Sequence, residues 1–491
     1  MNSPKPTVAI AGATGFVGQA LIPTLLEDHR VIGLTRSPTR AALPDGSGVE
    51  WRHCDLFNLE EVVAALEGVD YAIYLVHSMM PSAKLVQASF ADMDLLLADN
   101  FARAAERNGA KRLVYVGGIR PDDAKPSAHL SSRLEVEQTL GGRATPVTAI
   151  RAGIILGPGG SSMKMMVELV RRLPAMILPS WTRSRSSPIA VDDVVRVVRR
   201  CMHEDASLNG SFDIGGPEVM SYREMMRRAA QLLKRKIPML PVPFFSPALS
   251  RHWVALITGT STSLVGPLVD SLRHSVVPEP NWMLDWVKEK AVSFETALRR
   301  SIDDEGRPLP NPRTRIRSGD DAQLKQGKTV RSVQRMIRPE HADAAWVADE
   351  YVRWLPSMVW PFLCADIDEA NCVVRFRVRF TRIALLELSL RPSASTPDLR
   401  IFEISGGFLA RTGPDVKPGW FELREVMERE AIIAAIHDFR PTLPWLIYSL
   451  TQAKVHLFVM RRFGAHLKRV QPREELPARI ESGKPQPPER V

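Results

Sequence analysis

The chain has 491 residues, of which 45% are hydrophobic and 24% charged, so its apolar side chains suffice for a large core and for more than one domain. Glycine (30 residues) and proline (38) are too few and too scattered for a collagen-like or wholly disordered chain. The net charge of +10 is small for this length, and basic residues alternate with acidic ones. Because no DNA- or RNA-binding motif is present, this favours a generally basic surface over a nucleic-acid groove.

Neither a disulfide scaffold nor a metal site is expected, because no C-x-x-C pair and no zinc-type histidine cluster occurs. The cysteines are Cys54, Cys201, Cys364 and Cys372. The expected compartment is therefore the reducing cytoplasm. The N-terminus, Met1–Pro6, lacks the apolar core of a signal peptide. The longest uncharged stretch, His252–Val269, is interrupted by Thr, Ser, Gly and Pro, so no transmembrane helix is expected there.

The first part of the chain alternates short apolar segments with amphipathic ones such as Leu95–Asn108. The apolar segments predict buried strands at Val8–Ala11, Val31–Leu34, Tyr71–Val76, Leu113–Val116, Val147–Arg151, Ile189–Val191 and Ser211–Ile214. Such alternation indicates βαβ units and a parallel sheet. Asp192 follows one strand and is expected to cap the helix through Val198.

The composition changes between residues 303 and 328, which hold three prolines, four arginines and few apolar side chains, so this segment is predicted to be a linker. After it, apolar residues alternate with polar ones in the segments 374–380 and 386–390, and two further strands are expected at 401–404 and 421–426. Period-two alternation predicts an antiparallel sheet with one apolar face.

The basic residues on the polar face of that sheet leave two interpretations open. Arg375, Arg377 and Arg379 can form a cross-strand salt ladder with Glu387, Glu403 or Glu422. Alternatively, they form a basic ligand-binding face, although exposed sheet faces more often carry ladders.

Two helices are expected beside the sheet, at 342–355 and 443–463. The second carries apolar residues together with Lys454, Arg461 and Arg462, so it could lie on an anionic membrane surface. It could equally cover the apolar face of the sheet, and we favour this role because a one-faced sheet must bury that face. The tail from 471 to 491 is predicted to be disordered.

A glycine loop follows the first strand directly and precedes an apolar helix. Its residues are Gly12, Ala13, Thr14, Gly15, Phe16, Val17 and Gly18. In this context, the first glycine permits a tight turn, the second lets the backbone approach a pyrophosphate, and the third lets the helix pack on the sheet. The helix N-terminus then offers N–H groups to the phosphates.

The residues after the second strand indicate which dinucleotide binds. A cofactor with a free 2′-hydroxyl needs Asp or Glu here, whereas this chain has Arg36 and Ser37, with Arg40 nearby. A guanidinium suits a 2′-phosphate, so NADP(H) is preferred and NAD(H) remains possible.

These residues resemble the extended and atypical branches of the short-chain dehydrogenase/reductase superfamily. The glycine spacing is the extended-type fingerprint, and later segments resemble family landmarks in the same order. They are Cys54-Asp55-Leu56, Leu75-Val76-His77, 151–159, 187–194 and 215–218. The resemblance implies that Asp55 and Leu56 contact the adenine and that Leu75, Val76 and His77 lie beside the cofactor.

Within the superfamily, the chain is most similar to NmrA-like proteins and to the NADPH-binding accessory subunit of respiratory complex I. The C-terminal part more weakly resembles helix-grip domains of the START/polyketide-cyclase type. We therefore expect an α/β fold, a doubly wound parallel Rossmann sheet with a substrate lobe, followed by an α+β antiparallel-sheet domain. The expected boundaries are 5–302 for the first domain (lobe mainly 160–188 and 217–300), 303–328 for the linker and 329–470 for the second domain.

The chain departs from the superfamily where hydride chemistry normally occurs. The family pattern needs a Tyr, a Lys one helical turn later, and a Ser at the end of the fifth strand. Here that strand ends Tyr115-Val116-Gly117-Gly118, and His129 and Arg133 occupy the helical positions of the pair. Tyr115 lies inside a strand and is expected in the core. Arg133 could hold ribose or phosphate but cannot titrate, whereas His129 could donate a proton.

Two functions are consistent with this departure. The first is a cofactor-binding scaffold or redox sensor that acts through a protein partner. The second is an NADPH-dependent oxidoreductase or isomerase that uses His129 as the acid. The lobe after the sixth strand is rich in Met and poor in charge, which suits a quinone, lipid or isoprenoid better than a sugar nucleotide, although ordinary interdomain packing explains it equally well. Peripheral contact with the inner face of the membrane is a further possibility.

Overall fold

The computed structural model describes residues 4–42, 46–77, 85–121, 126–242, 270–310, 329–413, 416–427 and 430–470. His252–Val269, most of the predicted linker and the predicted tail lie outside these ranges. The chain divides into two compact units. The first unit contains residues 1–79 and 97–317, and the second contains residues 80–96 and 318–491.

The first unit is built on a seven-stranded sheet in which all neighbouring strands are parallel. Its order is β12 (Gly210–Ile214), β7 (Val147–Ala152), β6 (Arg112–Gly118), β4 (Tyr71–Tyr74), β1 (Thr7–Ala11), β2 (Arg30–Thr35) and β3 (Glu50–His53). The strand order reverses between β1 and β4, so the crevice at their carboxyl ends is the expected ligand site. The central strands are apolar because both faces of the sheet are covered.

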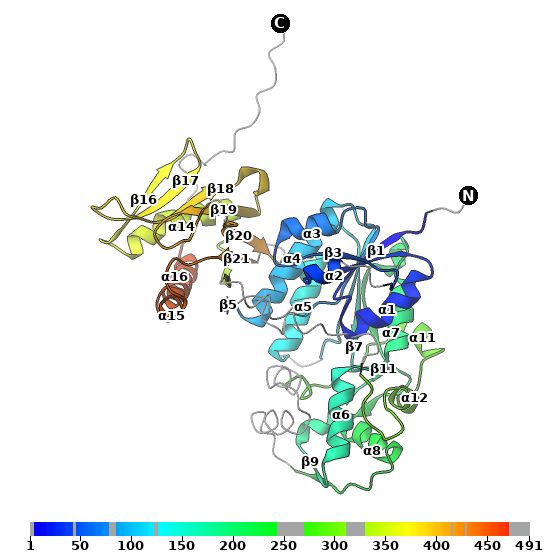
Figure 1. Cartoon of the computed structure of the whole chain (residues 1–491). Helices are drawn as coiled ribbons and strands as arrows, with labels where there is room; N and C mark the ends of the chain where they lie inside the picture. The colour runs from blue at the N-terminus through cyan, green and yellow to red at the C-terminus, as the bar shows by residue number, and fades with distance from the viewer. Residues whose placement is uncertain are drawn as a thin grey trace. The chain divides into compact units, whose positions relative to one another are not determined.

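Helices lie on both faces of this sheet, so the predicted doubly wound architecture is confirmed (Figure 1). One face carries α1 (Phe16–Leu26), α7 (Val191–Arg200) and α11 (Trp282–Lys288), and the other carries α3 (Leu59–Ala65), α4 (Phe90–Arg107) and α5 (Ala128–Gly141). A short helix, α2 (Pro38–Ala42), follows β2.

The predicted cap at the start of α7 is wrong. The helix begins at Val191 with Ala190 as its N-cap, so Asp192 lies inside the first turn. Its exposed carboxylate instead pairs with Arg300 at 2.9 Å.

Short strands and three helices form the lobe of the first unit. The helices are α6 (Ser161–Arg172), α8 (Tyr222–Leu232) and α12 (Phe294–Arg299). The strand pairs are β8 (Ile155–Leu156) with β11 (Ile189–Ala190), β9 (Met176–Leu178) with β14 (Met239–Pro241), and β10 (Arg185–Ser186) with β13 (Met220–Ser221). Apolar side chains of α6, α8 and α12 share one buried core, which holds the lobe together.

The second unit contains an eight-stranded sheet. Its order is β16 (Leu363–Asp368), β17 (Val373–Val378), β18 (Ala384–Leu390), β19 (Leu399–Gly406), β20 (Trp420–Val426), β21 (Ala431–Phe439), β15 (Val330–Ile337) and β5 (Leu85–Gln87). The pairs from β16 to β15 are antiparallel, as predicted, whereas β5 pairs with β15 in parallel.

The strand β5 is a feature that the sequence analysis did not anticipate. Residues 85–87 precede the predicted linker by more than two hundred positions in the chain, yet they complete the edge of the second sheet. Gln87 strengthens this connection, because its Nε2 donates to the carbonyl oxygen of Ala453 at 2.9 Å. The domain boundaries at 5–302 and 329–470 remain a prediction. The structure adds residues 85–87 to the sheet of the second unit.

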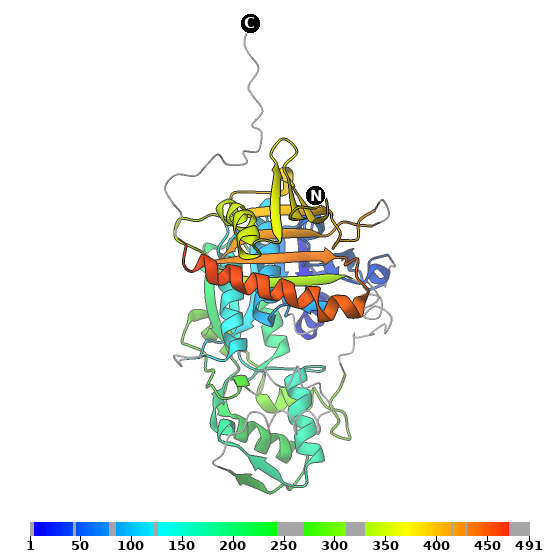
Figure 2. The same ribbon diagram turned by 90° about the vertical axis from the view of Figure 1, so that its left-hand side faces the viewer.

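One face of the second sheet is covered by α14 (Ala344–Met358) and α16 (Gln452–Leu467), and in Figure 2 α16 lies in front of the sheet. The covering role that we favoured for the second predicted helix is therefore confirmed. The prediction of a single helix over 443–463 is wrong, however. The helix α15 (Trp445–Leu450) is followed by Thr451, whose φ of −120° and ψ of −84° are not helical. The break lets both Tyr448 and Ala453 reach the buried core.

The predicted salt ladder is present in part. Arg375 lies 3.6 Å from Glu387 and 3.7 Å from Asp368, and Arg377 pairs closely with Asp366 rather than with one of the predicted glutamates. Arg379 is beyond the end of β17 and lies 4.0 Å above the Trp360 ring.

A buried charged cluster is present on β20 and β21. The Glu422 Oε1 atom lies 2.7 Å from Arg424 Nη2 and 3.1 Å from His437 Nε2, and all three side chains are at most 2% exposed. Trp420 stacks on the His437 ring at 4.5 Å. Burial alone would raise the pKa of Glu422, but the Arg424 guanidinium and the His437 ring outweigh it and lower this pKa to about 2.

We expect Glu422→Gln to destabilise the protein by about 3–5 kcal/mol near neutral pH, because Arg424 would keep a buried charge without its counter-ion. The pKa of Glu422 is lower in the folded state than in the unfolded state. Its stabilisation is therefore complete above the unfolded pKa and is lost as the pH falls toward the folded one. Urea unfolding near neutral pH and at about pH 3 should show a smaller acid loss for Glu422→Gln than for the wild type. Equal losses would contradict this assignment.

Candidate functional site

The glycine loop joins β1 to α1 through a tight turn. Gly12 has a φ of +88°, and its carbonyl oxygen accepts a hydrogen bond from the Gly15 N–H at 2.9 Å. A Cβ atom at Gly12 would lie 3.1 Å from Leu75, and one at Gly18 would lie 2.4 Å from the Gly12 oxygen. The loop therefore needs glycine at Gly12 for its left-handed backbone, and at Gly18 because the helix rests on the loop.

The N-terminal end of α1 is open toward the crevice. Its N-cap, Gly15, contributes no side-chain hydrogen bond, and no acidic residue lies in its first turn. Ala13 is buried, whereas Thr14 and Gly15 are exposed. Gln19 holds the loop in place, because its Nε2 donates to the Ala13 oxygen at 3.0 Å. Since the first-turn N–H groups have no side-chain cap, the loop fits a diphosphate.

The segment after β4 lies against this loop. The Leu75 N–H donates to the Ala11 oxygen at 3.0 Å, which continues the β1–β4 pairing as far as the glycine turn. Leu75, Val76 and His77 are all half-buried. The His77 ring lies 4.9 Å from the His129 ring, so the structure brings together two predicted residues from different parts of the chain.

The residues after β2 differ in the contacts that their side chains make. Ser37 is buried, with its N–H bonded to Thr35 Oγ1 and its Oγ accepting from the Arg40 N–H, each at 3.1 Å. The Arg40 guanidinium lies 4.9 Å above the Trp51 ring. Arg36 is half-buried, and no ion pair or hydrogen bond of its guanidinium occurs in the part of the chain that the structure describes. Of the two arginines, Arg36 is thus the one whose guanidinium makes no hydrogen bond, ion pair or ring contact among the described residues.

The Asp55 and Leu56 segment forms a rigid turn after β3. Asp55 Oδ1 accepts from the Phe57 N–H at 3.1 Å, and the Asp55 N–H donates to Glu61 Oε2 at 3.0 Å. Leu56 is buried, and its carbonyl oxygen accepts from Asn100 Nδ2 at 2.8 Å. These hydrogen bonds hold both residues in a defined conformation.

The helix α5 carries His129 and Arg133. Ser127 caps it, because its Oγ accepts from the Leu130 N–H at 3.3 Å. No ion pair of the Arg133 guanidinium occurs among the described residues. The Arg133 carbonyl oxygen accepts a hydrogen bond from Tyr115 Oη at 3.3 Å.

Tyr115 is fully buried, as the sequence analysis expected, and it explains the end of β6. A Cβ atom at Gly117 would lie 2.6 Å from the Tyr115 ring. The space that a serine side chain would need at this position is therefore occupied by the tyrosine.

An apolar cavity of about 350 Å³ extends from the glycine loop into the lobe. Phe16 and His129 line it from the dinucleotide side. Its methionines, from α6 and α8, are Met165, Met166, Met225 and Met226. The predicted Met-rich lobe therefore contains a cavity that these methionines line. Met163 is not among them and packs in the core of the lobe.

Two cavity residues were missed from the sequence. Trp181 and Tyr222 line it with their rings 6.1 Å apart, and both are about 8% exposed. Burial raises the pKa of Tyr222. The Trp181 Nε1–H is buried and has no hydrogen-bond partner within the described ranges. A buried donor of this kind is costly unless the oxygen of a water molecule or of a ligand accepts from it. No sequence motif marks it.

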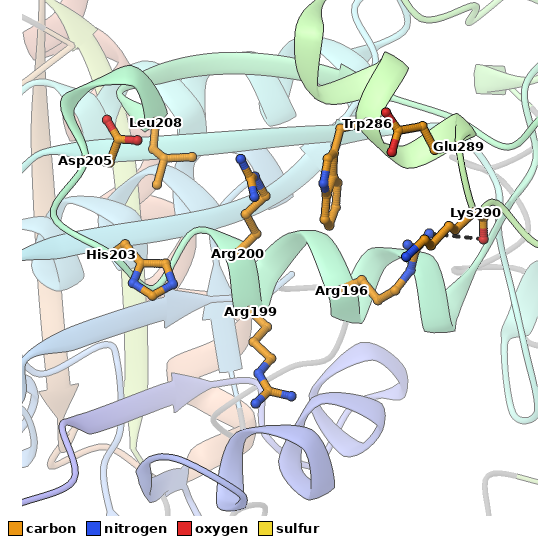
Figure 3. A pocket seen from close by; sticks show the side chains of 9 residues that line it. All are labelled: Arg196, Arg199, Arg200, His203, Asp205, Leu208, Trp286, Glu289 and Lys290. Atoms are coloured by element: carbon orange, nitrogen blue, oxygen red, sulfur yellow. Dashed lines mark hydrogen bonds between the residues drawn. The ribbon is translucent and has the colours of Figure 1, made fainter.

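A larger hollow, of about 620 Å³, lies between α7, α11 and the segment before β12 (Figure 3). It is at the amino end of the sheet, opposite the glycine loop. Its Arg196 and Arg200 guanidinium groups lie 5.4 and 4.9 Å from the Trp286 ring. Arg199 pairs with Asp28 and Glu27, each at 2.8 Å. These contacts give the arginines a structural role.

The fold and the loop define a dinucleotide-binding protein of the doubly wound class. Residues 12–144 match the family described as NAD(P)H-binding, so this part of the chain is an NAD(P)H-binding domain. The predicted resemblance to atypical short-chain dehydrogenases/reductases is confirmed for this domain, and the C-terminal resemblance to START-type domains remains a prediction.

Three relatives illustrate the similarity. The auxiliary protein GraX of Staphylococcus aureus is 34% identical over 143 residues, which cover 29% of this chain and 43% of that protein. The ceramide reductase of Caulobacter vibrioides is 26% identical over 58% of this chain and 90% of its own length. NADH dehydrogenase [ubiquinone] 1 alpha subcomplex subunit 9 of Arabidopsis thaliana is 21% identical over 48% of this chain and 60% of that protein. The chain thus matches less than half of GraX.

No helix within the described ranges is both long and apolar enough to span a bilayer.

We expect Gly18→Ala to weaken NAD(P)H binding, because the new methyl group would meet the Gly12 oxygen and displace the loop. Overpacking costs about 1–3 kcal/mol, so the dissociation constant should rise about tenfold or more. Calorimetric titration measures it. Gly141→Ala is a matched control, since a Cβ atom there meets nothing within 4 Å. Unchanged binding in Gly18→Ala would contradict the role of the loop.

Proposed function

We propose that the protein is an NADP(H)-dependent reductase of a hydrophobic ligand that carries an acceptor oxygen. The observation that carries this proposal is the apolar cavity that Phe16 of the glycine loop and His129 of α5 line together. A cavity of this kind beside a dinucleotide crevice is the default position for a substrate.

The residues fit the cofactor. The backbone around Gly12 and Gly15 would hold the diphosphate. Glycine is needed at Gly12, because a Cβ atom there would lie only 3.1 Å from Leu75. The guanidinium of Arg36 would bind the 2′-phosphate, and that of Arg133 would bind ribose hydroxyls or phosphate. Bound NADPH would supply a hydride.

The chain itself would supply the proton and the orientation of the ligand. An imidazole is a common general acid, and that of His129 lines the cavity, so it would protonate the ligand oxygen. The buried Trp181 Nε1–H would donate a hydrogen bond to a ligand oxygen, which would satisfy this donor. The methionines adapt to an irregular apolar body, such as that of a quinone, lipid or isoprenoid. The similarity to the ceramide reductase, which covers 90% of that protein, supports a reductase with a lipid-like ligand.

A second candidate is a scaffold or redox sensor that binds the cofactor and a protein partner without turnover. The observation that favours it is the end of β6, where neither Gly117 nor Gly118 offers the hydroxyl group of a substrate-orienting serine, and where the Tyr115 ring fills the space beside Gly117. Arg133 also cannot replace a lysine that titrates. Turnover distinguishes the two candidates.

We expect Arg36→Ala to weaken NADPH binding by about 1–3 kcal/mol and to leave NADH binding nearly unchanged, because only NADPH carries the 2′-phosphate. Isothermal titration with each cofactor measures the ratio. Arg40→Ala is the matched control, because its guanidinium is stacked on Trp51. If both cofactors lose affinity equally, the 2′-phosphate role of Arg36 is wrong.

We expect His129→Gln to reduce the rate of NADPH oxidation with quinones or long-chain ketones by about 10²–10⁴-fold, the range of a lost general acid. NADPH affinity should stay within a few fold, because the proton from His129 is transferred to the ligand and not to the cofactor. Stopped-flow absorbance with a panel of quinones and ketones measures turnover. If the wild type binds NADPH and oxidises it with none of these ligands, the scaffold function replaces the reductase.

A further inference from the structure

One end of the second unit's sheet carries a group of exposed apolar side chains. The strand register places the start of β16, the end of β17, the start of β18 and the end of β19 at this end. The exposed fractions are Trp360 62%, Phe362 71%, Phe380 91%, Ile383 52% and Phe408 61%. We call this group, with the arginines described below, the apolar–arginine end.

Backbone hydrogen bonds show that the turns of the apolar–arginine end are neighbours. The Arg379 N–H donates to the Phe362 oxygen at 2.9 Å. The Phe408 N–H donates to the Ala384 oxygen at 2.8 Å, and the Arg411 N–H donates to the Arg440 oxygen at 2.8 Å. The turns that carry the exposed side chains are therefore neighbours at one end of the sheet. Directly after these turns comes α15, whose Leu446 is 70% exposed.

Phe380 is difficult to explain by folding alone. It lies in the β17–β18 turn with a φ of +62°, a left-handed conformation that is unfavourable for a bulky residue and suits Gly or Asn. Its side chain is nevertheless almost fully exposed to solvent. A costly residue at this position indicates a function for the ring outside the fold.

The charges of the apolar–arginine end are of one sign among the described residues that form it. Arg379 lies over Trp360, and no ion pairs of Arg382, Arg411 or Arg440 occur in the described part of the chain. Arg375 and Arg377, further along β17, pair with carboxylates. Asp415, in the β19–β20 loop, lies outside the described residues.

We propose that the apolar–arginine end docks on the surface of an anionic lipid bilayer. Its aromatic side chains project from separate turns, so a fluid interface can receive each of them, whereas a rigid protein partner would need a pocket for every one. Tryptophan, phenylalanine and arginine side by side are the residue types that anchor proteins at the headgroup level. The free guanidinium groups are complementary to phosphate headgroups.

This inference does not depend on the proposed reductase function, because the surface lies in the second unit and needs no cofactor. It also differs from the membrane role considered for the helix at 443–463. The buried face of α16 covers the sheet, and the proposed contact is made by turns.

The test is sedimentation of the full chain with vesicles. We expect binding to phosphatidylcholine vesicles that contain phosphatidylglycerol, and little binding to phosphatidylcholine alone or in high salt. Phe380→Asn should lower the partition coefficient about fivefold or more without loss of thermal stability, since Asn suits a positive φ. Arg382→Gln combined with Arg411→Gln should lower it about tenfold or more.

The matched control is Ile337→Ser. Ile337 is 55% exposed on β15, and the register places it at the opposite end of the same sheet. It should leave binding unchanged. Absence of binding to the anionic vesicles, or an equal loss in Ile337→Ser and Phe380→Asn, would overturn the proposal. So would a wild-type dimer in analytical ultracentrifugation that Phe380→Asn converts to a monomer, because a second copy would then be the occupant.

Discussion

The first unit depends on a close contact between the glycine loop and the helix that follows it. At Gly18, a single added carbon atom would lie 2.4 Å from the Gly12 oxygen. This contact seats the N-terminus of α1 at the carboxyl end of β1, beside the reversal of strand order. Leu75 closes the loop from the neighbouring strand. The dinucleotide crevice, and the position of the cavity beside it, both follow from that arrangement.

Tyr115 and His129 shape the region where β6 and α5 meet. Tyr115 fills the end of β6 from within the core, so glycine rather than serine stands at Gly117. His129 is then the titratable group that reaches the cavity from α5. Trp181, whose Nε1–H is buried, lines the same cavity together with Ser161, Ser162, Ser271 and Tyr222. An apolar cavity with a few polar groups suits a hydrophobic ligand with few polar atoms.

Charged side chains of the second unit occur in two different settings. Within the sheet, Glu422 holds Arg424 and His437 in a buried cluster, and Arg375 and Arg377 pair with carboxylates across strands. At the turns, arginines lie beside exposed aromatic rings without such partners among the described residues. Charged side chains within the strands therefore stabilise the fold, whereas those at the turns are available to a ligand.

Local patterns in the sequence determined the class of the fold, because strand–glycine–helix order and period-two alternation each follow from backbone geometry. They also located the glycine loop, His129 and Arg133. The sequence could not reveal that β5 joins the second sheet, since pairing between distant segments has no local signal. The same holds for Trp181, Tyr222 and the exposed turns around Phe380. Only the tertiary structure decided these features, because burial and exposure depend on residues that are far apart in the chain.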